Sequence, residues 1–216
     1  MESIETPRAL GAVVFEGYDG SGKTTLLRKA ANRASRSRDV VCIGRKAERQ
    51  LSDIAVAIER PKGRLVPETD FLLRVALEVE RWQLVQDALE QDRTVLCDRG
   101  IISLLAWPEY LGITVKHLSA LLDHLVEERQ ETLNIVCLAD FETCWSRIEQ
   151  RENRSPKEQR GKEANRRFFT AYHRSVDRAA SAGLRLLTVD TQRSSINASM
   201  EVIASEFKRL GVSLDV

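Results

Sequence analysis

A glycine-rich stretch near the start of the chain constrains the fold more than any other feature. Residues 12–15 form an apolar run, typical of a buried strand. Gly17–Thr24 then spells G-x-x-x-x-G-K-T, the phosphate-binding loop, here called the P-loop. An amphipathic helix pattern follows over about residues 22–37. Strand, loop and helix in this order are the context that the motif requires, so the sequence predicts a site for a nucleoside triphosphate.

The P-loop residues explain how such a ligand would be held. Glycines permit backbone angles that turn several N–H groups toward a polyphosphate, and the helix that follows adds its positive N-terminal end. We expect Lys23 to reach the β- and γ-phosphates and the Thr24 hydroxyl to bind Mg²⁺. The residues expected to hold the nucleotide are Gly17, Asp19, Gly20, Ser21, Gly22, Lys23, Thr24 and Thr25.

The rest of the chain alternates apolar runs with helical patterns. Strands are expected at about 12–16, 40–43, 94–98, 134–138 and 184–189. Helices are expected at about 22–37, 47–60, 68–90, 101–106, 114–129, from 141, 163–182 and 195–210. This alternation predicts an α/β protein with the P-loop NTPase fold: a parallel five-stranded sheet with helices on both faces. We interpret residues 1–216 as one domain with a flexible arm at 1–9.

Composition excludes several classes of protein. The net charge of +1 gives no general case for binding nucleic acid or an anionic membrane. The first residues lack the pattern of a signal peptide, and no apolar run is long enough to span a membrane. We therefore expect a soluble, cytoplasmic protein. The cysteines, which include no C-x-x-C pair, are expected to be buried free thiols: Cys42, Cys97, Cys137 and Cys144.

Two aspartates follow apolar strand patterns. Ligands of parallel α/β sheets bind beyond the carboxyl ends of the strands, so the P-loop, Asp98 and Asp140 should share one edge. Asp98 could support Mg²⁺ or position a substrate hydroxyl, or it could cap a helix or a turn. The neighbouring Arg99 favours a role in phosphoryl chemistry. Asp140 is interpreted as a helix N-cap, because a helix pattern begins at Phe141.

Residues 147–167 are rich in arginine and lysine, and Pro156 interrupts their helical pattern. Three interpretations remain open: a basic lid over the phosphates, a solvated helix face with Glu–Arg pairs, and a nucleic-acid patch. The P-loop favours a lid at about 147–162. Since the P-loop has no cation between Gly17 and Lys23, the lid should supply one. Arg151 and Arg154 are the candidates, and Arg147 is expected to clamp adenine or phosphate.

Several motifs together resemble the thymidylate kinase family. The stretch Phe15–Thr25 is similar to that family's loop F-E-G-[hydrophobic]-D-G-x-G-K-T-T. Asp98–Trp107 resembles D-R-Y-x-x-S-x-x-A-Y, and Val79–Gln83 resembles A-D-R-A-Q, whose arginine reads the base. The Arg147–Arg154 stretch resembles the family's lid, and Val189-Asp190 its I-D pair. The resemblance covers nearly the whole chain in order.

The resemblance implies an ATP-dependent phosphotransferase that uses Mg²⁺ and acts on a small nucleotide or nucleoside-like acceptor. The residues implied to be catalytic are Lys23, Asp19, Asp98, Arg99, Arg151 and Arg154, and Thr24 and Asp98 would support the metal. The residues implied at the acceptor are Glu16, Asp19, Arg45, Arg81, Arg99 and Ser103. For Arg81 the alternative is a solvated charged stripe with Arg74 and Glu78 at helical spacing.

Departures from the family pattern lie on the acceptor side. Gly44–Glu48 stands in place of E-P-G-G-T, Gly100 replaces the tyrosine of D-R-Y, Pro108 replaces a glutamine, and Ser155 replaces the lid aspartate. We interpret Gly100 as opening space for a larger or differently oriented acceptor. The acceptor is therefore expected to be atypical, with dTMP as the leading candidate.

Other functions stay open. One alternative is a P-loop kinase that phosphorylates a hydroxyl of a nucleoside, an antibiotic or a modified DNA base, so nucleic acid remains open as an acceptor. Another is a nucleotide-binding regulatory module without kinase activity. A switch GTPase is disfavoured because the sequence has no N-K-x-D motif. We expect no membrane partner and keep a homodimer open.

Overall fold

The computed structural model describes residues 12–34, 39–44, 49–59, 65–114 and 116–209. Five parallel strands form one sheet, in the order β2-β3-β1-β4-β5. The strands are β1 (Ala12–Glu16), β2 (Val40–Ile43), β3 (Thr94–Asp98), β4 (Leu133–Leu138) and β5 (Arg185–Asp190). The expected fold class, a five-stranded parallel α/β sheet, is confirmed.

The helices alternate with the strands along the chain. They are α1 (Lys23–Ala34), α2 (Arg49–Glu59), α3 (Pro67–Glu90), α4 (Ile101–Leu105), α5 (Trp107–Leu111), α6 (Ser119–Glu127), α7 (Phe141–Glu149), α8 (Lys162–Ser181) and α9 (Ile196–Arg209), with short 3₁₀ turns η1 (Lys116–Leu118) and η2 (Glu158–Arg160). Within the described residues, none of these helices is both long and apolar enough to cross a membrane.

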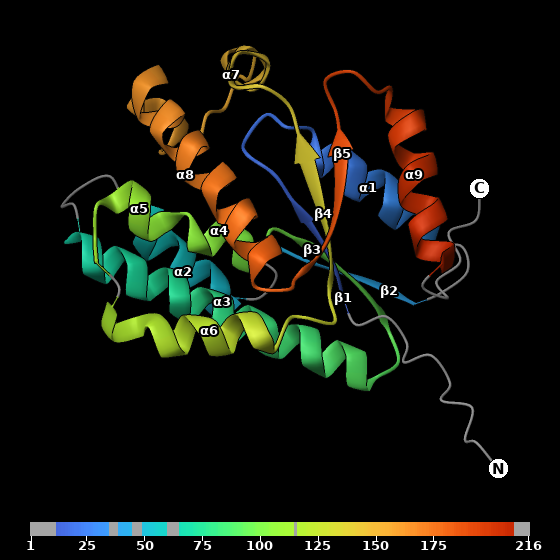
Figure 1. Cartoon of the computed structure of the whole chain (residues 1–216), viewed down its shortest axis with the longest axis horizontal. Helices are drawn as coiled ribbons and strands as arrows, with labels where there is room; N and C mark the ends of the chain where they lie inside the picture. Colours follow the sequence, from blue (N-terminus) through green and yellow to red (C-terminus); the bar gives the residue numbers. More distant parts are fainter. Residues whose placement is uncertain (1–11, 35–38, 45–48, 60–64, 115, 210–216) are drawn as a thin grey trace.

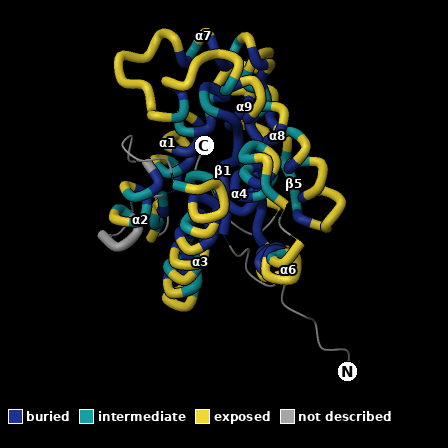
Figure 2. The backbone as a smooth tube through the Cα atoms, turned by 90° about the vertical axis from the view of Figure 1, so that its left-hand side faces the viewer, coloured by how far each residue is buried: buried dark blue, intermediate teal, exposed yellow. Residues whose placement is uncertain are grey.

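The sheet lies between two layers of helices (Figure 1). Apolar side chains of α1 and α9 pack on one face, against β1, β4 and β5. Those of α3 pack on the other face against β1, β2 and β3, and α4, α6 and α8 extend that layer. The central strands β1, β3 and β4 are mostly buried, the edge strands β2 and β5 are only partly buried, and the helices keep exposed outer sides (Figure 2). Burial on both faces explains why most of the strands read as continuous apolar runs.

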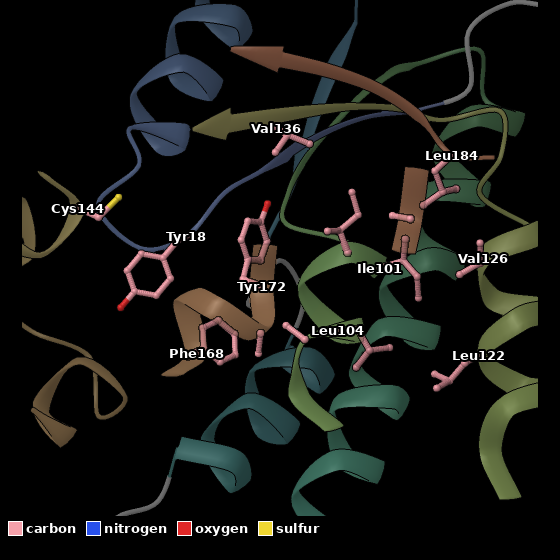
Figure 3. Close-up of a cluster of buried hydrophobic side chains, with 14 of the residues drawn as sticks. Tyr18, Ile101, Leu104, Leu122, Val126, Val136, Cys144, Phe168, Tyr172 and Leu184 are labelled. Carbon is pink, nitrogen blue, oxygen red and sulfur yellow. The ribbon is translucent and has the colours of Figure 1, made fainter. Parts of the chain in front are cut away.

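An aromatic part of the core lies beside the P-loop. Tyr18, from the loop itself, and Phe168 and Tyr172, from α8, are fully buried in one cluster (Figure 3). The Tyr18 hydroxyl donates a hydrogen bond of 3.0 Å to Asn165 on α8. This packing joins the P-loop to the helix that follows the lid.

Some local expectations were wrong. Val40–Ile43 was expected to be a buried strand, but β2 is the edge of the sheet and Cys42 is exposed. The other cysteines are buried free thiols, as expected. The chain forms α5 at Trp107–Leu111, where no helix was expected, because Pro108 fits the first turn of a helix. The predicted arm at 1–9 lies outside the described residues.

Candidate active site

The P-loop follows β1 and turns at three glycines with positive φ: Gly17 at 157°, Gly20 at 81° and Gly22 at 87°. A Cβ on Gly20 would lie 2.3 Å from the carbonyl oxygen of Cys144 in α7. The loop backbone therefore approaches α7 too closely for any side chain at this position. The helix α1 begins directly after the loop, at Lys23, so its positive end faces the loop.

Lys23 faces Asp98 across the P-loop. The Lys23 Nζ lies 3.5 Å from Asp98 Oδ1, and that oxygen is buried with no hydrogen-bond partner among the described residues. Burial and the nearby Arg99 lower the pKa of Lys23, while Asp98, Asp19 and Glu16 oppose this shift. Because β3 lies next to β1 in the sheet, the Asp98 carboxylate at the end of β3 lies beside the P-loop.

The same region fits a magnesium ion. Mg²⁺ in such sites is held by one or two carboxylates together with phosphates and water, not by a cage of protein ligands. Within the part of the chain that the structure describes, no group of three or more His, Cys, Asp or Glu side chains could form such a cage. This kind of site needs oxygen ligands. Thr24, at the start of α1, supplies a hydroxyl, and Asp98 supplies Oδ1, which accepts no hydrogen bond among the described residues.

Arg99 connects the end of β3 to the P-loop. Its Nη1 donates hydrogen bonds to the carbonyl oxygen of Gly17 at 2.8 Å and to Ser103 Oγ at 3.3 Å, and its Nη2 pairs with Asp19. Arg99 has a φ of 70°, which few residues other than glycine adopt. This unusual backbone conformation therefore occurs at the residue whose side chain contacts the P-loop.

Asp19 forms a second ion pair with Lys157 of the lid, a residue that was not predicted to act in the site. The Nζ of Lys157 pairs with Asp19 and lies 4.0 Å from the centroid of the Phe168 ring. Burial lowers the pKa of Lys157 to about 8, although Asp19 opposes the shift. Burial alone would raise the pKa of Asp19, but Lys157, Arg99 and Lys23 together hold it well below its usual range. The only signal for Lys157 in the sequence was its place in the basic stretch, directly after Pro156.

The lid arginines lie in different environments. Arg147 donates hydrogen bonds of 3.0 Å to the carbonyl oxygens of Gly20, in the P-loop, and Thr191. Arg151 pairs with Glu158 at 2.6 Å, and Arg154 is exposed. Neither Arg151 nor Arg154 lines the cavity beside the P-loop.

A cavity of about 400 Å³ opens beside the P-loop. Its P-loop end is charged and is lined by Asp19, Arg99 and Lys157. An apolar part of its wall is formed by Ile58, Leu77, Leu104 and Trp107, and Arg74 also lines it. The Arg74 guanidinium stacks over the Trp107 ring at 3.2 Å from its centroid, and it also pairs with Asp70.

Three residues expected at the acceptor have partners within the protein. Glu16 is fully buried and accepts hydrogen bonds from Gly100 N at 2.8 Å and Ser103 Oγ at 2.5 Å, and it does not line the cavity. Burial raises its pKa, against the hydrogen bond from Ser103. Arg81 and Ser103 do line the cavity. The terminal nitrogens of Arg81 donate to Glu78 and to the carbonyl oxygens of Asp98 and Arg99.

Gly100 does not open the acceptor space in the way that we expected. A Cβ at this position would point into the core, 2.9 Å from Val14 Cγ1 and 3.4 Å from Glu16 Oε1. Gly100 lines the cavity, but the close packing of β1 against this turn is what requires a glycine here. The N-cap interpretation of Asp140 is confirmed, since Asp140 Oδ1 accepts a hydrogen bond from Thr143 N at 2.7 Å. Arg45 lies outside the described residues.

Several known proteins are similar to this chain over part of its length. Relatives described as thymidylate kinase include one from Bacillus licheniformis, 36% identical over 47% of this chain and 51% of its own length. Another, from Wolbachia pipientis, is 30% identical over 62% and 67% of the two chains. A third, from Staphylococcus epidermidis, is 28% identical over 68% and 75%. The chain thus spans about half the length of the Bacillus relative that it matches.

A wider comparison covers the whole site. The family model described as thymidylate kinase matches residues 15–203, a range that begins at the end of β1 and ends in α9. That range contains the P-loop, Asp98, Arg99 and the lid. By this match, over a parallel sheet with a P-loop at its carboxyl edge, the chain belongs to the thymidylate kinase family.

Proposed function

We propose that this protein is an ATP-dependent nucleoside monophosphate kinase. The observation that carries the proposal is the charged end of the cavity, where Arg99 and Lys157 converge on Asp19 beside the P-loop. Two cations at that place suit a dianionic acceptor phosphate better than a neutral hydroxyl. The family match supports the same activity.

In the proposed reaction, an oxygen of the acceptor phosphate attacks the γ-phosphorus of ATP. The bond from that phosphorus to the β–γ bridging oxygen breaks, so ADP leaves and a nucleoside diphosphate forms. Catalysis of this transfer depends mainly on positioning and on neutralising charge. Lys23 would contact the β- and γ-phosphates, and Arg147, which already binds the P-loop carbonyl of Gly20, would lie near the donor nucleotide.

Thr24 and Asp98 would hold Mg²⁺, which when bound neutralises phosphate charge during transfer. Asp98 is suited to this because one of its oxygens is buried and has no hydrogen bond among the described residues. Its ion pair with Lys23 would keep the carboxylate aimed at the P-loop.

The lid would supply the second cation through Lys157. Lys157 is buried against the P-loop aspartate, whereas Arg151 pairs within the lid and Arg154 is exposed. We therefore favour Lys157 over Arg151 and Arg154 as the lid residue that contacts the transferred phosphoryl group. The two arginines remain the alternative that mutagenesis has to test.

The apolar part of the cavity wall would hold the base. The apolar wall of Leu77 and Leu104 and the stacked Arg74–Trp107 pair suit a flat, uncharged ring. We propose dTMP as the leading acceptor among the deoxynucleoside monophosphates.

The test is a panel of acceptors with γ-labelled ATP: deoxynucleoside and ribonucleoside monophosphates, free nucleosides, and single-stranded DNA with modified bases. We expect label in a nucleoside diphosphate. Label only in a monophosphate made from a free nucleoside, or only in DNA, would instead support the hydroxyl-kinase alternative. No transfer beyond slow ATP hydrolysis would support a regulatory module. A homodimer and a cytoplasmic location remain predictions.

A further inference from the structure

A buried row of charged side chains, here called the buried chain, extends from the wall of the acceptor cavity into the protein. Arg81, Glu78 and Arg129 are only 4%, 7% and 2% exposed. Glu78 Oε2 accepts a hydrogen bond from Arg81 Nη2 at 2.8 Å, and Glu78 Oε1 lies 3.5 Å from Arg129 Nε. Burying such charges carries a large desolvation cost, so a hydrophobic replacement could stabilise the fold equally well. Their presence therefore calls for a role other than stability.

One end of this chain holds the turn at Asp98–Gly100. Arg81 Nη1 donates to the carbonyl oxygen of Asp98 at 3.0 Å, and Arg81 Nη2 donates to that of Arg99 at 2.5 Å. On the other side of the turn, Arg99 N donates to the carbonyl oxygen of Phe15 at 2.9 Å. The φ of 70° at Arg99 is unfavourable for a residue with a side chain, so it persists only where surrounding contacts impose it.

The other end of the chain is fixed at the end of α6. Arg129 Nη1 donates to the carbonyl oxygen of Leu125 at 2.6 Å, and the Arg129 guanidinium lies over the Trp82 ring at 4.4 Å from its centroid. Arg129 also pairs with Glu128 at 3.3 Å. Unlike Arg81 and Glu78, Arg129 does not line the acceptor cavity.

We infer that Arg129 and Glu78 are positioning residues which, through Arg81, hold the Asp98–Gly100 turn in its reactive orientation. Arg81 makes the direct contacts with the turn, and Glu78 and Arg129 hold Arg81 in place. The inference rests on the proposed kinase function, because it concerns the groups that act in that reaction: Asp98 toward Lys23 and Arg99 toward the P-loop. Because both side chains leave the same short turn, a rotation of its backbone displaces both of them.

The kinetic test uses Arg129, which is remote from the acceptor. The variants are Arg129→Met, the conservative Arg129→Lys, and Arg93→Met as a control arginine that pairs with Asp39 at the opposite end of β3. We expect Arg129→Met to lower kcat by about tenfold, the lower end of the loss that follows removal of a direct outer partner, because Arg129 acts through Glu78 and Arg81. The KM for ATP should change little, Arg129→Lys should recover part of the rate, and Arg93→Met should match wild type.

Base selectivity separates a positioning role of Arg129 from a role in recognition. For wild type and Arg129→Met, kcat/KM is measured with dTMP and with dGMP. We expect Arg129→Met to lower the two values by the same factor, so that their ratio stays at the wild-type value. Wild-type kcat in Arg129→Met, or a tenfold or larger change of that ratio, would overturn the inference.

Hydrogen exchange of the free protein tests the inference even if no monophosphate is phosphorylated. We expect faster amide exchange over residues 98–103 in Arg129→Met than in wild type or Arg93→Met. Unchanged exchange there would overturn the inference, whatever the substrate. Should Arg129→Met fail to fold, Arg129→Lys and Glu78→Gln provide the same comparison with smaller changes of shape.

Discussion

The lid lysine gives the sharpest prediction about the site. In Lys157→Met the side chain keeps much of its length and its contact with Phe168 but loses the charge that meets Asp19. Asp19 keeps Arg99 as a partner, so no buried charge is left alone and the fold should survive. Removing one preorganised group that stabilises developing charge typically lowers kcat by about 10²–10³-fold, or about 2.7–4 kcal/mol.

Arg151→Met is the matched control in the same lid. Arg151 is half-exposed and pairs with Glu158, whose other oxygen accepts a hydrogen bond from Ser155 N at 2.6 Å. Because Arg151 does not line the cavity, its loss should change kcat by no more than about fivefold, although the buried Glu158 loses one partner. Steady-state kinetics with ATP and the best acceptor measure both variants. Wild-type kcat in Lys157→Met with a large loss in Arg151→Met would refute the assignment.

Three further predictions concern the donor site, the turn and the pH dependence. Lys23→Ala should lower kcat by roughly 10²-fold or more without unfolding the protein, and near-normal turnover would contradict the kinase assignment. Gly100→Ala should destabilise the fold by about 1–3 kcal/mol because its Cβ would lie 2.9 Å from Val14 Cγ1, and an unchanged Tm would contradict this packing. Since the pKa of Lys157 is lowered to about 8, kcat/KM should fall as the pH rises through 8. Above pH 8 the folded protein binds fewer protons at Lys157 than the unfolded chain does, so the contribution of this lysine to the free energy of unfolding rises with pH. A profile of kcat/KM that stays flat to pH 10 would contradict the role of Lys157.

Much of the fold could be predicted from local patterns. The P-loop has to follow a strand and open a helix, and the alternation of apolar runs with helical patterns leaves a parallel sheet as the simplest packing. Because parallel strands end at one edge, Asp98 and Asp140 could be placed there before their contacts were known. The N-cap of Asp140 is a local interaction, and it too was predicted correctly.

What could not be predicted depends on contacts between distant parts of the chain. The sequence does not give the order of the strands, so β2 could not be recognised as an edge and Cys42 as exposed. Gly100 was interpreted as making room for the acceptor, whereas a glycine is required there because the Val14 side chain lies so close. Lys157 meets Asp19 only because α8 packs on the P-loop through Tyr18 and Asn165.

The most direct test of the central claim is the identity of the labelled product formed from γ-labelled ATP and Mg²⁺ with each deoxynucleoside monophosphate. The charged end of the cavity predicts that the label enters a nucleoside diphosphate, with dTMP expected to be the best acceptor, and that Lys157→Met lowers the rate at least a hundredfold. If every monophosphate stays unlabelled while a free nucleoside or a DNA hydroxyl takes up the label, the proposed monophosphate kinase function is contradicted.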